Sequence, residues 1–158
     1  MFIDIRHLTP TDVPLMNALL RTFGEAFNDV DTYTANPPSE AYLRRLLGRD
    51  SFIALAALKS GHVVGGIAAY ELKKFEQERS EIYIYDLAVV REHRRKGIAT
   101  ALIEKLKKIA VRRKAWVIFV QADTGVEDEP AIALYTKLGR REDILHFDIP
   151  VSGRPGAG

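Results

Sequence analysis

The sequence has no cysteine among its 158 residues, which excludes disulfide bonds and thiol chemistry. A metal site would need histidine and carboxylates alone. The four histidines (His7, His62, His93 and His146) show no helical ligand spacing, so we expect no metal. The sequence also lacks an apolar run long enough to span a membrane, a signal-like N-terminus and internal repeats. These absences favour a cytoplasmic protein with no membrane partner.

The composition, 47% hydrophobic and 28% charged, is that of a soluble globular protein. We expect one domain over residues 1–150 and a disordered Gly/Pro-rich tail over residues 151–158. The net charge is only +2, but residues 91–114 are strongly basic, whereas residues 25–31 and 123–129 are acidic. This distribution suits an anionic cofactor and a cationic second substrate. Solvated faces that alternate in charge would give the same pattern.

The most informative stretch, residues 82–110, predicts a strand, a tight basic turn and a helix. Residues 82–90 are rich in β-branched and aromatic side chains, as strands are. Apolar residues spaced by three and four then predict the helix: Ile98, Leu102, Leu106, Ile109 and Ala110. The turn between them contains several cations and Gly97, next to helix N–H groups that have no partner inside the helix. We interpret it as a pyrophosphate cradle. An ordinary strand-to-helix turn with a solvated basic face is the alternative.

The rest of the chain predicts strands and helices in the order β-α-α-β-β-β-α-β-α-β. Strands are expected at residues 2–6, 51–58, 63–72, 115–121 and 142–149, besides the central one. Helices are expected after Thr9-Pro10, from Ser39-Glu40 and around Pro130, with a loop over residues 28–38. Gly65-Gly66 indicates a bulge or a close backbone neighbour. The order predicts a mixed α/β sheet with helices on both faces.

The spacing Arg94-x-x-Gly97-x-Ala99 resembles the signature of the GNAT-type N-acetyltransferase superfamily. The segment Ala131-Ile132-Ala133-Leu134-Tyr135-Thr136-Lys137-Leu138-Gly139 is similar to a second motif of that family, and the element order is also the family's. The resemblance implies the GNAT acyltransferase fold, whose central sheet is mixed, mostly antiparallel and twisted.

Several short segments resemble, more narrowly, the aminoglycoside 3-N-acetyltransferases. They are Phe23-Gly24-Glu25, Phe75-Glu76-Gln77, residues 80–89, Glu92-His93-Arg94-Arg95, Val120-Gln121-Ala122-Asp123, residues 133–139 and His146-Phe147-Asp148-Ile149. Two features depart from the pattern: the acidic loop at residues 123–129 is longer, and Asp128 stands where the superfamily often has Asn. Both bear on the range of acceptors.

This resemblance implies direct transfer of acetyl from acetyl-CoA to the 3-amino group of the 2-deoxystreptamine ring of an aminoglycoside, giving antibiotic resistance. The implied contacts with coenzyme A are made by the backbone of Leu87, Ala88 and Val89, and by the turn and helix start Arg94, Arg95, Lys96, Gly97, Ile98, Ala99 and Thr100. The Val89 N–H would polarise the thioester oxygen, an oxyanion-hole role worth about 3 kcal/mol.

Two side chains are candidate catalytic groups. Asp86 lies where related enzymes place a carboxylate, and it would act as general base for the acceptor ammonium. Because Asp86 and Val89 alternate to opposite faces, this assignment requires a bulge in the strand. Tyr135 matches the family motif and would protonate the departing thiolate. The alternatives are a structural hydrogen-bond acceptor for Asp86 and a core tyrosine with a satisfied hydroxyl for Tyr135.

Five carboxylates would line the site for a cationic small-molecule amine: Asp29, Asp31, Glu81, Asp123 and Asp148. Each alone also fits solvated surface. A polyamine, a small amine or a protein amine is the alternative acceptor. A nucleic-acid-binding module is disfavoured because the cations have no interleaved aromatics, and a catalytically inactive acetyl-CoA sensor is the last alternative. Long apolar strands suggest a homodimer by analogy with the family.

Overall fold

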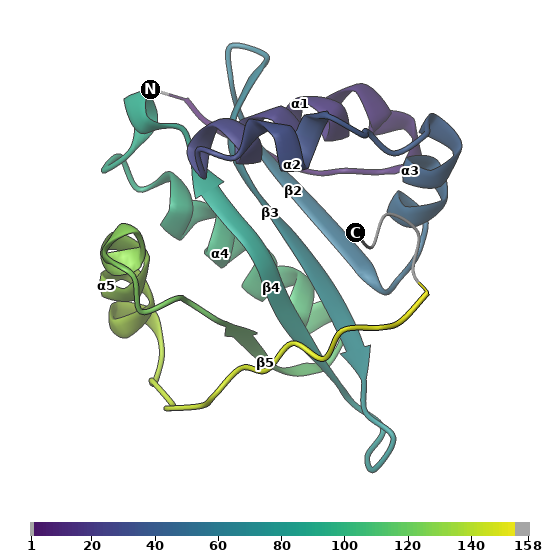
Figure 1. The fold of residues 1–158 in the computed structure, drawn as a ribbon, viewed down its shortest axis with the longest axis vertical. Coiled ribbons are helices and arrows are strands. Elements are labelled where there is room, and N and C mark those ends of the chain that lie inside the picture. Colours follow the sequence, from purple (N-terminus) through teal and green to yellow (C-terminus); the bar gives the residue numbers. More distant parts are fainter. Residues whose placement is uncertain (1, 154–158) are drawn as a thin grey trace. The chain divides into compact units, whose positions relative to one another are not determined.

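The computed structural model describes residues 2–153, and the chain divides into two units, Met1–Gln121 and Ala122–Gly158. The first unit is built on a five-stranded sheet in the order β1-β2-β3-β4-β5 (Figure 1). The strands are β1 (Asp4–His7), β2 (Phe52–Lys59), β3 (His62–Lys73), β4 (Ser80–Val89) and β5 (Ala115–Val120). The first four pair antiparallel, and β5 runs parallel to β4. The predicted mixed, mostly antiparallel sheet is therefore confirmed.

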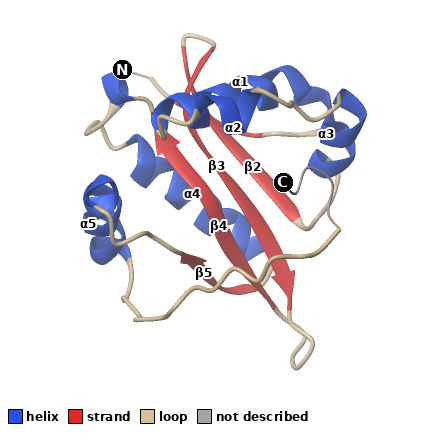
Figure 2. Cartoon of the chain, in the orientation of Figure 1, coloured by secondary structure: helices blue, strands red, loops and turns tan. Residues whose placement is uncertain are grey.

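Helices cover both faces of this sheet (Figure 2). One face carries α1 (Val13–Ala26), which follows a 3-10 turn at Pro10–Asp12, together with α2 (Val30–Thr34) and α3 (Glu40–Leu47). The other face carries α4 (Ile98–Arg112). The expected capping of α3 is present, because the Ser39 Oγ accepts a hydrogen bond of 3.1 Å from the Tyr42 N–H. Residues 30–34, predicted as loop, instead form the short helix α2.

The core lies on both faces of β2 and β3, since each of these strands is flanked by other strands and covered by helices. Toward α1 and α3, the cluster includes Met16, Leu19, Phe23, Leu43, Ala54 and Ala68. The buried stripe of α4 is the one expected from the sequence: Ile98, Leu102, Leu106, Ile109 and Ala110. Burying these side chains on two faces supplies most of the apolar area that holds the sheet in place.

The sequence predicted a bulge or a close backbone neighbour at Gly65-Gly66, and the structure has a bulge beside the pair and a close neighbour at Gly66. Ala57 pairs with Gly65 and Leu58 with Val63, so Val64 is an extra residue that forms a bulge in β3. A side chain at Gly66 would meet the Leu19 side chain and the Leu55 carbonyl. Only glycine allows α1 to approach the sheet this closely.

The second unit contains a 3-10 turn at Val126–Asp128 and helix α5 (Glu129–Leu138), with Pro130 in its first turn as predicted. The strand expected at residues 142–149 is wrong: this segment is neither strand nor helix. Its apolar side chains stay exposed, and a strand forms only where a neighbouring backbone pairs with it. In the predicted tail, residues 151–153 contain a turn, and residues 154–158 lie outside the described residues.

None of the helices within residues 2–153 combines the length and apolar character that a bilayer span requires.

Candidate active site

Strand β4 is paired differently in its two halves. It pairs with β3 along its whole length, but with β5 only from Ser80 to Ile84. Asp86 pairs with Ala68 and Ile84 with Ala69, so Tyr85 between them is an extra residue in a bulge. Beyond this bulge, the edge of β4 that faces away from β3 has no strand partner in the described chain, and β4 and β5 diverge there (Figure 2).

The backbone of this open edge presents hydrogen-bonding groups. The Val90 N–H donates to the Val64 carbonyl of β3 at 2.9 Å. Since N–H and C=O groups alternate in direction along a strand, those of Leu87 and Val89 point away from β3, and those of Ala88 point toward it. The Val89 carbonyl accepts a hydrogen bond of 2.9 Å from the Arg94 Nε. The Val89 N–H points to the same edge, where β5 no longer pairs with β4, and it remains available there.

The turn that follows β4 has the shape of an anion cradle. Arg95 and Gly97 have φ values of 60° and 78°, in the left-handed region. Ala101 is the first residue of α4 whose N–H reaches back to the Gly97 carbonyl, at 3.0 Å. Among the described residues, no N–H from position 95 to position 100 donates to a backbone carbonyl. Successive unpaired N–H groups at a helix start form a site for phosphate.

The cations of the cradle have different surroundings. Arg95 and Lys96 are exposed at the turn. Arg94 is exposed as well, but its guanidinium bonds the Val89 carbonyl, and also the carbonyl of Ala26 at the end of α1, at 3.4 Å. Its side chain therefore ties the cradle to β4 and α1, a role that the sequence did not indicate.

Asp86 lies half-buried on the face of the sheet that α1 and α2 cover. Its Oδ2 accepts a hydrogen bond of 3.0 Å from the Tyr33 hydroxyl of α2. Burial raises the pKa of Asp86, and the hydrogen bond from Tyr33 opposes that shift. The bulge required by the sequence argument is present, but it precedes Asp86 and does not lie between Asp86 and Val89. The side chains of Asp86 and Val89 therefore still point to opposite faces of the sheet. The direction of the Val89 N–H does not depend on this, because backbone N–H groups lie in the plane of the sheet.

The predicted acceptor carboxylates of the first unit lie in two places. Asp29 precedes α2, where its Oδ1 accepts a hydrogen bond from the Thr32 hydroxyl at 2.8 Å, and Asp31 lies within α2. Burial raises the pKa of Tyr33, and the charge of Asp86 and, least, that of Asp29 raise it further. Glu81 lies in the paired half of β4, about 15 Å along the strand from Asp86. It forms an ion pair with Lys74, at 3.8 Å, and is not grouped with the others.

The second unit contains Tyr135, on α5, and two of the predicted carboxylates. Burial, reinforced by Asp128, raises the pKa of Tyr135 to about 12. The Asp128 carboxylate accepts a hydrogen bond of 2.7 Å from the Asp123 N–H and closes the acidic loop, which an Asn side-chain oxygen could do equally well. Asp148 lies 2.9 Å from the His146 Nε2.

Sequence reasoning missed the tyrosines around Asp86. Tyr33 lay in a stretch rich in Asn, Asp and Pro, which predicts loop and gives no sign of a partner 53 positions away. Tyr70, Tyr83 and Tyr85 form an edge-to-face row on the same face as Asp86, with ring centroids 5.8 and 5.9 Å apart. Alternation along β4 already places Tyr83 and Tyr85 on one face, and the bulge at Tyr85 is what brings Asp86 to that face as well.

Comparison with known families agrees with this geometry. The model of the acetyltransferase (GNAT) family matches residues 14–139. The chain belongs to the GNAT acetyltransferase family. Members of this family use acetyl-CoA, so the expected co-substrate is confirmed. The residues of this chain fit it, because the cradle offers unpaired N–H groups and cations to a pyrophosphate, and the open edge of β4 offers backbone partners to an amide-containing arm.

Solved structures give narrower likenesses. An aminoglycoside acetyltransferase from an uncultured soil metagenomic sample is 71% identical, with a TM-score of 0.95 over 96% of this chain and 100% of that one. A second, from a similar sample and in complex with sisomicin, is 29% identical, with a TM-score of 0.86 over 96% and 97%. A ribosomal-protein-alanine N-acetyltransferase from Brucella melitensis biovar Abortus 2308 is 26% identical, with a TM-score of 0.72 over 96% and 100%. Comparison with curated proteins gave no match.

Among residues 2–153, no group of three or more His, Asp or Glu side chains is arranged to hold a metal ion.

Proposed function

We propose that this acetyltransferase acts on aminoglycoside antibiotics, at the 3-amino group of the 2-deoxystreptamine ring, and so confers resistance. The observation that carries the proposal is the position of Asp86, a half-buried carboxylate beside the open edge of β4 and on the same strand as the available Val89 N–H. The 71% identity to an aminoglycoside acetyltransferase supports the acceptor class. The segments of this chain that resemble the aminoglycoside 3-N-acetyltransferases, above all residues 80–89, support acetylation at the 3-amino group.

Coenzyme A would be held by three parts of the chain. The N–H groups of residues 95–100 would bind the pyrophosphate, with Arg95 and Lys96 adding positive charge. Leu87, through its outward-facing backbone groups, and Val89, through its N–H, would bond the pantetheine arm in the manner of an added strand, with Ala88 between them. Bound acetyl-CoA supplies the thioester whose acetyl group is transferred.

Each catalytic step would then use a defined group of this chain. An acceptor ammonium has no lone pair, so it must first lose a proton, which Asp86 would accept directly or through a water molecule. The Val89 N–H would donate a hydrogen bond to the thioester oxygen as negative charge develops there. As the amine nitrogen forms its bond to the acetyl carbon, the carbon–sulfur bond breaks, and Tyr135 would donate a proton to the thiolate. The amide nitrogen must lose a second proton, which would pass through water to the Tyr135 oxygen and restore the phenol. Its raised pKa keeps that proton in place at neutral pH, while making the donation less favourable than from an ordinary tyrosine.

The acceptor's positive charges would be met by carboxylates. Asp29 and Asp31 lie with Asp86 in the first unit, whereas Asp123 and Asp148 belong to the second and Glu81 to the paired half of β4. We assign all five to acceptor binding and expect Asp29 and Asp31 to contribute most within the first unit. We further propose that the enzyme works in the cytoplasm, without nucleic acid, and as a homodimer.

The second candidate acceptor is a protein amine. The 26% identity to a ribosomal-protein-alanine N-acetyltransferase favours it over a polyamine or another small amine, because the two chains align over nearly their full lengths. An acidic site attracts any of these cations.

A thiol-release assay over a panel of amines tests the function. The panel contains sisomicin, a kanamycin-type drug, spermidine and a peptide with an N-terminal alanine, each with acetyl-CoA. We expect rapid thiol release with the drugs, and one added acetyl group in the product by mass spectrometry. NMR of the product then assigns the acetylated nitrogen. Turnover of the peptide or of spermidine with none of the drugs would exclude the aminoglycoside assignment, and acetylation at another amino group would exclude the 3-N position.

A further inference from the structure

Tyr33 is joined to the candidate base by a hydrogen bond between segments far apart in the sequence. Its hydroxyl donates to the Asp86 Oδ2 at 3.0 Å, and both residues are partly buried. No hydrogen bond to the second oxygen, Oδ1, comes from the described part of the chain. The carboxylate therefore has one oxygen engaged and one left for a ligand.

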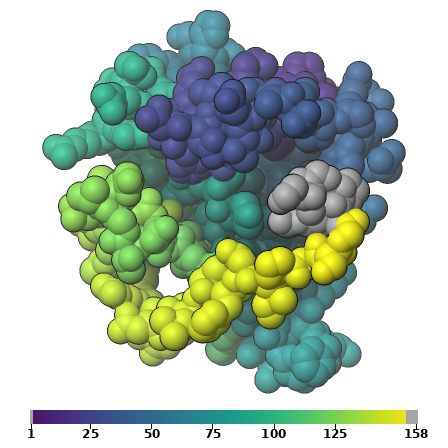
Figure 3. Space-filling model, in the orientation of Figure 1, coloured from purple at the N-terminus to yellow at the C-terminus, as the bar shows by residue number. Residues whose placement is uncertain are grey.

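The position of the Tyr33 ring is fixed by its neighbours. Its centroid lies 6.1 Å from that of Phe23 and 6.0 Å from that of Phe27, both at the end of α1. A side chain on Gly24 would approach the Val30 Cα to 3.0 Å, so glycine is what lets α2 pack onto α1. The Asp29 N–H also donates to the Gly24 carbonyl at 2.8 Å. In the space-filling view, the atoms of α1 and α2 form one continuous surface (Figure 3).

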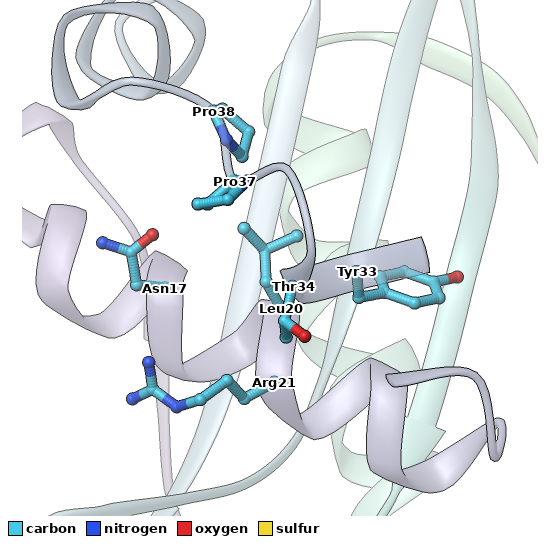
Figure 4. Close-up of a pocket in the computed structure, with 7 residues that line it drawn as sticks. All are labelled: Asn17, Leu20, Arg21, Tyr33, Thr34, Pro37 and Pro38. Carbon is cyan, nitrogen blue, oxygen red and sulfur yellow. The ribbon is translucent and has the colours of Figure 1, made fainter. Parts of the chain in front are cut away.

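The ring also separates two parts of the surface. Its other side borders an open groove lined by Asn17, Leu20, Arg21, Thr34, Pro37 and Pro38. Figure 4 shows the Tyr33 hydroxyl pointing away from the two prolines. The hydroxyl is thus directed to Asp86 and not to the groove.

Electrostatics indicate which partner carries the proton. Burial, followed by the charge of Asp86 and the hydrogen bond, raises the pKa of Tyr33 well above its usual range, so the phenol stays protonated and donates. The same hydrogen bond lowers the pKa of Asp86 against the effect of burial. The other titratable groups around this pair are Asp29 before α2, Tyr70 on β3, and Tyr83 and Tyr85 on β4. None of these carboxyl and phenol groups is a cation, so Tyr33, as the hydrogen-bond donor, is the group that favours the ionised carboxylate.

We propose that Tyr33 is a positioning residue for the acetyl transfer: its hydroxyl holds Oδ2 of the Asp86 carboxylate and turns Oδ1 toward the acceptor amine. This inference rests on the proposed function, in which Asp86 is the base. Oδ1 is then the atom that takes the proton from the acceptor ammonium, while Oδ2 remains bonded to Tyr33 throughout.

The test replaces Tyr33 with Phe, which keeps the ring in its aromatic cluster and removes only the hydroxyl. We expect the acidic limb of the kcat/KM profile for the acceptor to move up by about one pH unit, since losing a donor to a carboxylate raises its pKa. Below that limb kcat/KM falls about tenfold relative to wild type. At high pH the gap narrows but kcat/KM stays below wild type, because Oδ1 is no longer held toward the acceptor. KM for acetyl-CoA stays unchanged. Tyr70→Phe is the matched control, because its hydroxyl lies on the same face without a bond to Asp86, and its profile should coincide with that of wild type.

A measurement without turnover keeps this inference separate from the proposed function. NMR titration of the side-chain carboxyl carbon of Asp86, in wild type and in Tyr33→Phe, reports the pKa of Asp86 directly. We expect a higher value in the variant, whichever amine the enzyme acetylates. If Tyr33→Phe does not fold, the reciprocal titration of the Tyr33 ring in Asp86→Asn should show a lowered pKa of Tyr33. An unchanged pKa of Asp86 in Tyr33→Phe, or of Tyr33 in Asp86→Asn, overturns the inference.

Discussion

The two halves of β4 differ in what their backbones bond to. From Ser80 to Ile84 the strand has a neighbour on each side, and its inward side chains Ile82 and Ile84 are buried. From Asp86 to Val89 it has one neighbour, β3, and its other edge offers the Leu87 backbone groups and the Val89 N–H to a ligand. The Tyr85 bulge separates the halves.

This difference shows how one strand serves both stability and chemistry. A fully paired strand has no backbone groups left for a substrate, whereas an open edge is normally a liability that a protein must cover. Here the open edge borders the anion cradle and a half-buried carboxylate. The family's co-substrate can use the unpaired groups that an ordinary edge strand would leave to water or to another chain.

The largest effect should come from removing the base in the open half. Asp86→Asn keeps the shape of the side chain and a hydrogen-bond acceptor for Tyr33, but it cannot accept a proton from the acceptor ammonium. We expect kcat/KM for the acceptor to fall by about 100- to 10,000-fold at neutral pH. Steady-state kinetics measure this, with Asp50→Asn, an exposed position, as the matched control. Undiminished catalysis in Asp86→Asn would refute the assignment of the base.

The next largest effect should be a loss of stability from a substitution in the paired half of β4. Ile82 is fully buried, with 0% of its surface exposed, so Ile82→Ala leaves a cavity and should lower the free energy of unfolding by about 2–5 kcal/mol. Leu87 in the open half is only partly buried, and Leu87→Ala should cost less. Urea unfolding of both variants measures the difference. A greater loss for Leu87→Ala would contradict the division of β4 into a structural and a functional half.

The smallest effect should come from straining the cradle. Gly97 has a φ of 78°, and a Cβ placed there meets nothing within 4 Å, so Gly97→Ala changes only backbone preference. The expected loss of stability is about 1–2 kcal/mol, and relief of that strain should disturb the cradle and raise KM for acetyl-CoA. Gly61→Ala is a close control, because Gly61 has a φ of 80° and equally open surroundings in the β2–β3 hairpin. Thermal melts should give similar losses for both, with KM changed only for Gly97→Ala; equal KM values would argue against the cradle.

The sequence predicted those parts that depend on local patterns. The α4 stripe, the capped start of α3 and the Gly97 turn follow from side-chain spacing and backbone preference, which neighbouring residues determine. The expected strand at residues 142–149 did not form, although its apolar pattern is regular. Alternation gives a segment the ability to pair, but a partner must be present for a strand to form.

The candidate site was predictable only in part for the same reason. Asp86 and the cradle belong to one continuous stretch, so their proximity follows from chain connectivity. Tyr33 meets Asp86 only because α2 packs on α1 over the sheet, and the Arg94 bonds to Val89 and Ala26 likewise depend on tertiary structure. No local pattern encodes such contacts.

Amide hydrogen exchange, resolved by residue with and without coenzyme A, tests the central claim most directly. We predict that binding slows exchange at Leu87, Val89 and residues 95–100, while Ala88 and residues 81–84 barely change because their N–H groups already have partners or lie in the paired half of β4. Protection that appears elsewhere, with Val89 and the cradle exchanging as fast as in the free protein, would contradict the claim that the unpaired half of β4 holds the acetyl donor.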